Sequence, residues 1–239
     1  MPVITISNQF GAGGPEVGRE LAKRLGLDYL DKEILHRVAL EVNVADEEVE
    51  EFEEEHHSKF RSFFSTIFDL DALKKKAKVR EEELSSTGYD ERDKIPYHYH
   101  VDGWIDSDIY KQMVVRVITA LGQRRGVVIV GRGGQVILKD NPRTLHVRIV
   151  AEFEDRVAWT AKRRGMSLDE ARDFVHKVDA RSHDYLRFYF DVDPNQPTLY
   201  HLMLNTSRIP RERCVDMLVP LAREIAEKKE KEEEGEEEA

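Results

Sequence analysis

Short apolar runs alternate with segments of helical spacing along most of the chain. Five runs have the length and apolar character of strands, and they lie at residues 3–7, 27–30, 127–130, 144–150 and 200–205. Apolar residues recur at helical spacing in six further segments, namely 15–25, 32–42, 109–121, 154–164, 168–185 and 211–228. Alternating strands and helices predict an α/β protein with a mainly parallel sheet that helices cover on both faces.

Ligands of parallel sheets bind at the carboxyl ends of the strands. The loops of interest therefore follow Ser7, Leu30, Val130 and Val150. Two of these loops are rich in glycine, one in residues 8–14 and the other in residues 131–134.

The first glycine loop resembles half of a phosphate-binding loop. Glycines let backbone amides converge on an anion, and the following helix adds the positive end of its dipole. A complete loop of this kind also supplies a lysine and then a hydroxyl residue. In the favoured register Gly14 and Pro15 occupy those two positions. A register framed by Gly13 and Gly18 is disfavoured because Arg19 would then lie a full turn inside the helix. A purely structural turn is the alternative to phosphate binding.

Charge is distributed unevenly over the 239 residues. The net charge is -10, but residues 41–55 hold nine acidic residues without Lys or Arg, and residues 224–239 hold nine glutamates against three lysines. The rest of the chain is mildly basic, which suits phosphate ligands better than nonspecific nucleic-acid binding. The sequence shows no secretory signal and no apolar run of membrane-spanning length. With a single cysteine, Cys214, these features predict a cytoplasmic protein.

Several motifs, taken in order, resemble the cytidylate kinase-like family of nucleoside monophosphate kinases. The resemblance covers residues 3–42 and 110–220, and it rests on the first glycine loop, Leu30–Arg37, Val128–Gly134, Leu145–Ile149 with Arg156, Val178–Arg181 and Leu202–Ser207. It implies a P-loop NTPase-type three-layer fold with a helical insertion. It also implies transfer of the γ-phosphoryl group of ATP to a nucleoside monophosphate, with Mg²⁺ carried by the nucleotide.

The resemblance assigns roles to residues of both loops and of a lid at about residues 156–190. It implies ATP binding by Gly11, Ala12, Gly13 and Gly14, and monophosphate binding by Asp31, Arg37 and Arg132. It implies lid cations at Arg156, Arg163 and Arg164, and catalytic cations at Arg132, Arg181 and Arg187. Two plainer interpretations remain open: Asp31 as the cap of the next helix, and the three lid arginines as a solvated helix face.

The chain departs from the family pattern at four positions, Asn8, Gly14, Pro15 and Gly133. Lysine and the hydroxyl residue are missing, and relatives that carry an arginine in or beside the loop have it where Asn8 and Pro15 stand here. Gly133 replaces the aspartate of cytidylate kinases, so cytosine recognition does not follow. We therefore expect the lid arginines to supply the missing charge, and a lysine at position 14 to raise triphosphate affinity if the loop keeps its shape.

The domain prediction divides the chain into three parts. Residues 1–42 and 104–223 form the kinase-like core, residues 43–103 a helical insertion and residues 224–239 an acidic tail. The insertion carries an aromatic cluster at residues 60–68, which suits helix packing or a homodimer contact. The alternatives to a kinase are a noncatalytic nucleotide-binding protein of the same fold and an interaction module that uses the insertion and the tail.

Overall fold

The computed structural model describes residues 1–31, 107–124 and 126–237. The chain forms two compact units, one of residues 1–32 and 121–239 and the other of residues 33–120. The predicted helix at 32–42 and the insertion at 43–103, with its aromatic cluster, lie outside the described residues. Helix α5 (Ser107–Arg124) crosses the boundary between the units.

The first unit contains a parallel sheet of five strands. They are β1 (Val3–Asn8), β2 (Asp28–Leu30), β3 (Val127–Val130), β4 (Thr144–Val150) and β5 (Leu202–Asn205). The order across the sheet is β2-β3-β1-β4-β5, and every pair is parallel. Ile6 of β1 lies opposite both Val130 and Val147, so the ends of the three central strands meet at one edge. The predicted parallel sheet is confirmed.

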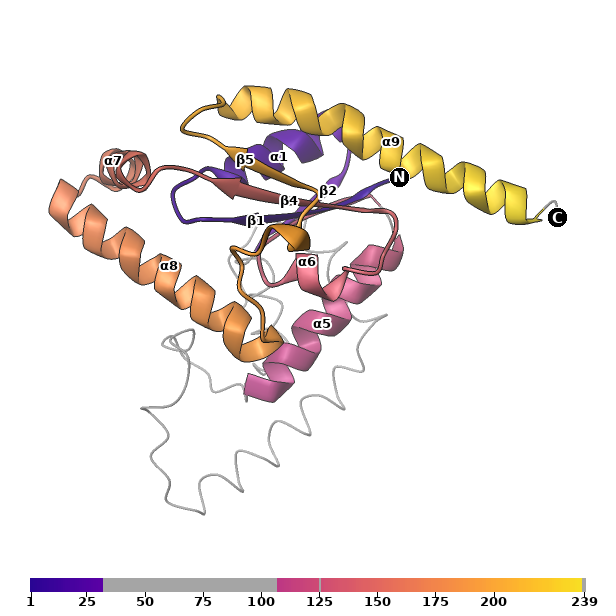
Figure 1. Ribbon diagram of the computed structural model, residues 1–239, viewed down its shortest axis with the longest axis horizontal. Helices are drawn as coiled ribbons and strands as arrows, with labels where there is room; N and C mark the ends of the chain where they lie inside the picture. The colour runs from indigo at the N-terminus through magenta and orange to yellow at the C-terminus, as the bar shows by residue number, and fades with distance from the viewer. Residues whose placement is uncertain (32–106, 125, 238–239) are drawn as a thin grey trace, which may run out of the picture. The chain divides into compact units, whose positions relative to one another are not determined.

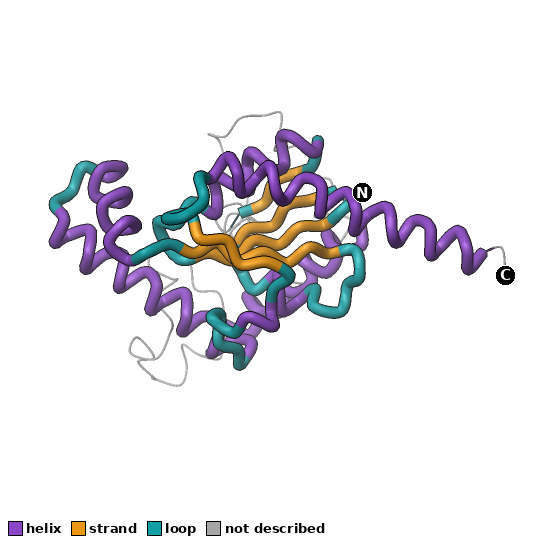
Figure 2. Tube along the Cα trace, turned by 45° about the horizontal axis from the view of Figure 1, so that its top comes forward, coloured by secondary structure: helices purple, strands orange, loops and turns teal. Residues whose placement is uncertain are grey.

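Helices lie on both sides of this sheet (Figures 1 and 2). The helices of this unit are α1 (Gly14–Leu25), α6 (Gly134–Ile137), α7 (Phe153–Arg164), α8 (Leu168–Phe190) and α9 (Arg211–Glu237), with a 3-10 turn η2 (Pro197–Leu199). Helices α1 and α9 lie on one side, and α6 and α8 on the other. Helix α8 runs five residues past its predicted end, and α9 continues to Glu237, into the predicted tail. The short elements α6 and η2 were not predicted.

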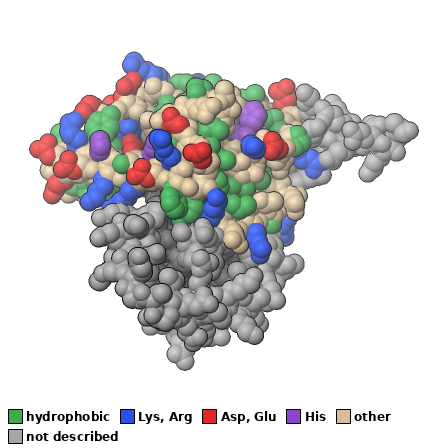
Figure 3. Space-filling model, turned by 60° about the horizontal axis from the view of Figure 1, so that its bottom comes forward, with side chains coloured by type: hydrophobic (Ala, Val, Ile, Leu, Met, Phe, Trp, Pro, Cys, Tyr) green, Lys and Arg blue, Asp and Glu red, His purple; other side chains and the backbone are tan. Residues whose placement is uncertain are grey.

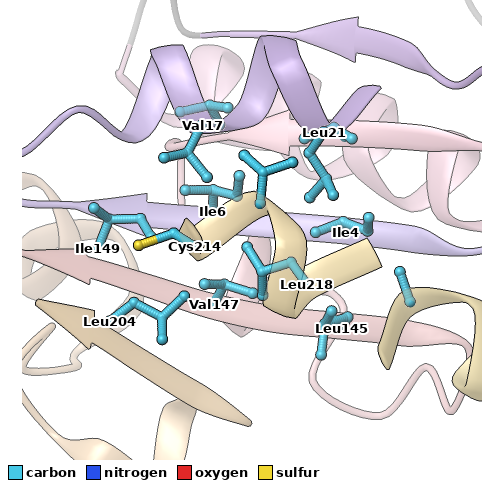
Figure 4. Packing of buried hydrophobic residues seen from close by; sticks show 14 of the residues in the cluster. Ile4, Ile6, Val17, Leu21, Leu145, Val147, Ile149, Leu204, Cys214 and Leu218 are labelled. Carbon is cyan, nitrogen blue, oxygen red and sulfur yellow. The ribbon is translucent and has the colours of Figure 1, made fainter. Parts of the chain in front are cut away.

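The face of the sheet under α1 and α9 is apolar. Figure 4 shows its packed side chains, which come from β1, β4, β5 and the two helices: Ile4, Ile6, Val17, Leu21, Leu145, Val147, Ile149, Leu204, Cys214 and Leu218. Burial of each large side chain contributes about 1.5–3 kcal/mol. At the surface, Arg24 of α1 donates to Asp216 of α9 at 2.6 Å. This packing holds α1 and α9 beside each other on the sheet.

The opposite face of the central strands is polar although it is buried. The Thr5 hydroxyl lies 2.7 Å from Nδ1 of His146, and Arg148 donates to the Ser7 hydroxyl at 2.7 Å. Burial, together with the stacked His201 ring, lowers the pKa of His146 to about 4. His146 is therefore neutral in the folded protein at physiological pH.

No helix of the described residues is both long and apolar enough to cross a lipid bilayer.

Candidate functional site

The first glycine loop is a tight turn between β1 and α1. Gly11 and Gly13 have φ angles of 83° and 91°, a region that favours glycine. Gly13 is the N-cap of α1, and its carbonyl accepts a bond from the Val17 amide. Ala12 is fully buried, and its carbonyl accepts a 2.8 Å bond from the Thr206 hydroxyl. A glycine turn at a helix amino terminus suits an anion, and ATP binding by residues 11–14 stays a prediction.

Phe10 ties the loop to the helices that follow β4. Its amide donates to Asp179 of α8 at 2.9 Å, and its carbonyl accepts a 3.1 Å bond from Arg156 of α7. Arg156 also pairs with Asp179 and donates to the Ala151 carbonyl. The Arg156 side chain is only 5% exposed. It therefore supports the loop from inside the fold, a different position from that expected of a lid arginine facing a nucleotide.

Helices α7 and α8 form a hairpin in the region predicted to be a lid. Gly165, with a φ of 66°, ends α7, and Ser167 with Glu170 forms a capping box that begins α8. The apolar side chains between the helices also contact Phe10. Figure 3 shows acidic and basic side chains mixed at this end of the molecule. Lid motion of the hairpin stays a prediction.

The other two predicted lid arginines lie nearer the surface. Arg163 forms an ion pair with Glu16 of α1, and its side chain is 70% exposed. The Arg164 guanidinium lies 4.4 Å from the centre of the Phe174 ring and 5.8 Å from that of Phe10. Both arginines therefore lie close to the first loop, although neither extends freely into solvent.

The second glycine loop carries its own arginine. Gly131 and Gly133 have φ angles of 86° and 76°, and Arg132 between them has a φ of 57°. A residue with a side chain rarely adopts this left-handed conformation, and such residues concentrate at functional sites. The Arg132 guanidinium lies 5.3 Å from the centre of the Tyr185 ring of α8. The backbone and α8 together determine where this cation points.

The structure describes two of the three residues predicted to bind the monophosphate. Asp31 follows β2 and Arg132 follows the adjacent β3, whereas Arg37 lies outside the described residues. Asp31 is buried and accepts bonds from the Tyr29 hydroxyl at 3.1 Å and from Arg19 at 3.3 Å. Burial and the Asp31 charge raise the pKa of Tyr29, which keeps its hydroxyl protonated.

The two predicted catalytic cations on α8 differ in exposure. Arg181 is half-buried and Arg187 is exposed. Within the described residues, no three His, Cys, Asp or Glu side chains gather in a way that would hold a metal ion.

Four residues that the sequence left without a role contact this region. Asp179 pairs with Arg156, and Asn8 packs against Gly14. Arg148 is buried among neutral partners, the Ser7 hydroxyl and the Asn195 side chain. Arg211, the first residue of α9, lies against Gly13. The contact of Asn8 with Gly14 lies within one loop, whereas the other three join distant parts of the chain, so no local pattern indicated them.

The fold and the two loops define an α/β protein of the P-loop kinase type. A model of the cytidylate kinase-like family matches residues 3–208. The chain belongs to the cytidylate kinase-like family, as the sequence motifs predicted.

The solved structures to which the chain is similar share little sequence with it. An uncharacterized protein from Eubacterium ventriosum ATCC 27560 has a TM-score of 0.61 at 17% identity, and the match covers 93% of this chain and 99% of that one. A gluconokinase from Sinorhizobium meliloti 1021 has a TM-score of 0.46 at 12% identity, covering 95% and 94%. A shikimate kinase from Bacteroides thetaiotaomicron has a TM-score of 0.45 at 14% identity, covering 93% and 98%.

A shorter match involves a curated protein, the uronate isomerase of Corynebacterium glutamicum. The two sequences are 27% identical over 94 residues, which are 39% of this chain and 18% of the isomerase. The chain thus spans less than a fifth of that relative, and the family assignment rests on the longer match.

Proposed function

We propose that the protein is an ATP-dependent kinase that phosphorylates a nucleoside monophosphate. The observation that carries the proposal is the pair of glycine loops at the ends of adjacent parallel strands. The loop after β1 is a glycine turn at the start of α1, and the loop after β3 carries Arg132. A phosphate donor on the first loop and a phosphate acceptor on the second would lie side by side, as phosphoryl transfer requires.

Phosphoryl transfer requires that the protein position the two phosphate groups and supply positive charge. It does not require a nucleophile from the protein. A phosphate oxygen of the monophosphate would bond to the γ-phosphorus of ATP while the bond to the β–γ bridging oxygen breaks, so that ADP leaves. The acceptor phosphate is already ionised at neutral pH, which removes the need for a general base. Mg²⁺ would be carried by the phosphates, because Pro15 cannot supply the hydroxyl ligand of a complete loop.

The predicted roles divide between the two substrates. Asp31, Arg37 and Arg132 are proposed to bind the monophosphate. Arg163, Arg164, Arg181 and Arg187 remain candidates for the charge that develops during transfer. Arg156 is better assigned to loop support, because it is buried and paired with Asp179.

A noncatalytic nucleotide-binding protein is the second candidate function. It is favoured by Gly14 and Pro15, which lack the cation and the hydroxyl of active loops. The aspartate that cytidylate kinases carry at position 133 would not fit here, because a Cβ at Gly133 would lie 2.6 Å from the Phe190 ring. The structure therefore gives no support for recognition of cytosine by this residue. The acceptor base is therefore a matter for measurement.

Turnover of ATP with CMP, UMP, AMP, GMP and their deoxy forms, beside calorimetric binding of each, tests the proposal. We expect transfer to one or a few of them, and Arg132→Ala to weaken binding of that acceptor by about tenfold, the usual scale for a charge-assisted hydrogen bond. Arg172→Ala is the matched control, since Arg172 pairs with Glu154 at the surface of α8. Binding without any turnover would favour the second candidate, and the absence of nucleotide binding would refute both.

A further inference from the structure

Arg211 places a guanidinium directly against the backbone of the first glycine loop. Its Nε lies 2.2 Å, and its Cζ 2.8 Å, from the position that a Cβ on Gly13 would occupy. Glycine at position 13 therefore does more than permit a φ of 91°. It leaves the space in which the Arg211 side chain lies.

The Arg211 side chain is held from its other side by an aromatic ring. Its Cζ lies 5.0 Å from the centre of the Trp159 ring of α7, a separation typical of a cation–π contact. Trp159 itself packs against the apolar core. The charged group thus lies close to both the Trp159 indole and the loop.

The backbone of Arg211 is equally well fixed. Arg211 is the first residue of α9, and the next turn of this helix buries Cys214 and Val215 in the core. The Arg24–Asp216 pair joins the same part of α9 to α1, the helix that begins at the loop. These contacts anchor the backbone at the start of α9.

Arg211 differs from the other arginines around the loop in its partners. Arg19 pairs with Asp31, Arg156 with Asp179 and Arg163 with Glu16. Among the described residues, no ion pair includes Arg211. A cation without a carboxylate partner, beside a glycine turn that lacks its lysine, has the chemistry of a phosphate ligand.

We propose that Arg211 supplies the positive charge of the phosphate-binding loop, in place of the missing lysine, and binds the phosphates of the nucleoside triphosphate. The proposal rests on the proposed function for the identity of the ligand. It replaces the expectation that the lid arginines alone supply this charge. Arg211 would then bind the triphosphate before the reaction. Other arginines would stabilise the charge that develops during phosphoryl transfer.

The test measures binding of inorganic tripolyphosphate, ATP and adenosine by calorimetry to the full chain and three variants. Arg211→Met removes the charge and keeps an apolar contact for Trp159, and Arg211→Lys keeps the charge. Arg213→Met is the matched control, because Arg213 lies on the same helix with its side chain 73% exposed and paired with Asp216. Thermal unfolding of each variant checks that the fold is retained.

We expect Arg211→Met to weaken tripolyphosphate and ATP binding by about thirtyfold, the scale of one charge-assisted contact, and to leave adenosine binding unchanged. Arg211→Lys should retain most of the affinity, and Arg213→Met all of it. A merely structural role would weaken all three ligands together. A role in stacking on the base would weaken adenosine and spare tripolyphosphate. Either of these results, or unchanged binding in Arg211→Met, would overturn the proposal.

Trp159 offers a second, independent measurement. The chain has two tryptophans, so Trp104→Phe leaves Trp159 as the sole indole. Tripolyphosphate should change the Trp159 emission in Trp104→Phe and leave it unchanged when Arg211→Met is added. An identical response in the double variant would count against Arg211 as the phosphate ligand.

The outcomes for Arg211 and for the proposed kinase activity remain distinguishable. Triphosphate binding that depends on Arg211, without turnover on any acceptor, would support this inference and refute phosphoryl transfer. If Arg211→Met leaves both turnover and ATP affinity unchanged, phosphoryl transfer would be supported and the role of Arg211 refuted. A wild-type chain that binds no triphosphate would refute both.

Discussion

The two glycine loops have similar positions and backbone conformations, but the cation beside each comes from a different part of the chain. Each follows a buried central strand, each has two glycines at positive φ, and each ends in a glycine N-cap, Gly13 or Gly133. The first loop has no cation of its own and lies against Arg211 of a distant helix. The second carries Arg132 within the turn. The two proposed phosphate sites therefore share a backbone design and differ in the part of the chain that places a cation beside it.

The support of the two loops differs as well. The first is bonded at Phe10 to a buried ion pair, Arg156 with Asp179. At the second, Phe190 of α8 fills the space at Gly133. Asp179 supports the first loop and Phe190 fills the space beside the second, so the two loops should respond differently to the same kind of change.

Removal of Asp179 should have the largest effect. Asp179→Ala leaves the buried Arg156 without its counter-charge and the Phe10 amide without its acceptor. We expect a loss of about 3–5 kcal/mol in the free energy of unfolding, measured by urea denaturation. Hydrogen exchange should accelerate at the Phe10 amide and remain slow in α6. The control Glu154→Ala removes an exposed pair with Arg172 and should cost less than about 1 kcal/mol.

Equal losses in Asp179→Ala and Glu154→Ala would show that the Arg156 pair contributes no more than a surface contact. Equal acceleration of exchange in both loops would show that they are not supported separately.

Lowering the pH should destabilise the second loop more than the first. Helix α6 packs on Thr5, whose hydroxyl is bonded to His146, and burial lowers the pKa of His146 from 6.5 to about 4. Between these pH values the unfolded chain binds a proton that the folded protein does not. Stability therefore falls as the pH drops from 6.5 toward 4, by up to about 3 kcal/mol.

Urea denaturation of the wild type and of His146→Gln across this pH range measures that contribution. The wild type should lose more stability than the variant as the pH falls, and exchange corrected for intrinsic rates should accelerate in α6 before it does at Phe10. Parallel pH profiles for the two proteins would remove His146 from the explanation.

Substitution of the two N-cap glycines compares the loops directly. Gly13→Ala and Gly133→Ala both place a side chain at positive φ, which costs about 1–2 kcal/mol. At Gly133 the new Cβ also overlaps the Phe190 ring, so we expect about 2–3 kcal/mol in total. At Gly13 it meets the end of the Arg211 side chain, which can rotate away.

Gly13→Ala should therefore lose triphosphate affinity more than stability, and Gly133→Ala the reverse. Gly26→Ala and Gly165→Ala are the controls, because both have positive φ and open space around the new Cβ. Thermal unfolding and tripolyphosphate calorimetry measure the two effects. A stability loss at Gly13 as large as that at Gly133 would mean that Arg211 cannot move.

The sequence predicted the sheet well because the strands are short apolar runs between turn residues. Burial on both faces leaves a parallel strand such as Val127–Val130 with no polar position to obscure it. Helix α6 was missed because four residues are too few for helical spacing to show. The insertion at 43–103 lies outside the described residues, so its predicted helices stay a prediction.

The candidate site could be predicted only as far as local motifs reach. Arg156 and Arg163 are seven residues apart and share a helix face, so spacing alone gives them the same role. Their partners separate them: Asp179 of α8 buries Arg156, while Glu16 of α1 leaves Arg163 exposed. Arg211 was missed for the same reason, because its neighbour Gly13 is at the other end of the chain.

A lysine at position 14 tests whether the first loop can be given its own cation as the second has. The sequence suggested a gain in triphosphate affinity if the loop kept its shape. The structure gives a different expectation, because a Cβ at Gly14 would lie 2.5 Å from Cγ and 2.6 Å from Cβ of Asn8. Rotation of the Asn8 side chain cannot relieve an overlap with its own Cβ, so the loop backbone would have to move.

We therefore expect Gly14→Lys alone to lose about 1 kcal/mol of stability through overpacking and to gain no ATP affinity. Adding Asn8→Gly removes the overlapping atoms, and this double variant should bind tripolyphosphate about fivefold more tightly than Asn8→Gly alone. It should also restore part of the affinity that Arg211→Met loses, since either cation would then serve the same phosphates. A gain from Gly14→Lys alone, at unchanged melting temperature, would show that Asn8 yields to a side chain at position 14. Failure of the double variant to offset Arg211→Met would place the Arg211 charge and the loop lysine on different parts of the ligand.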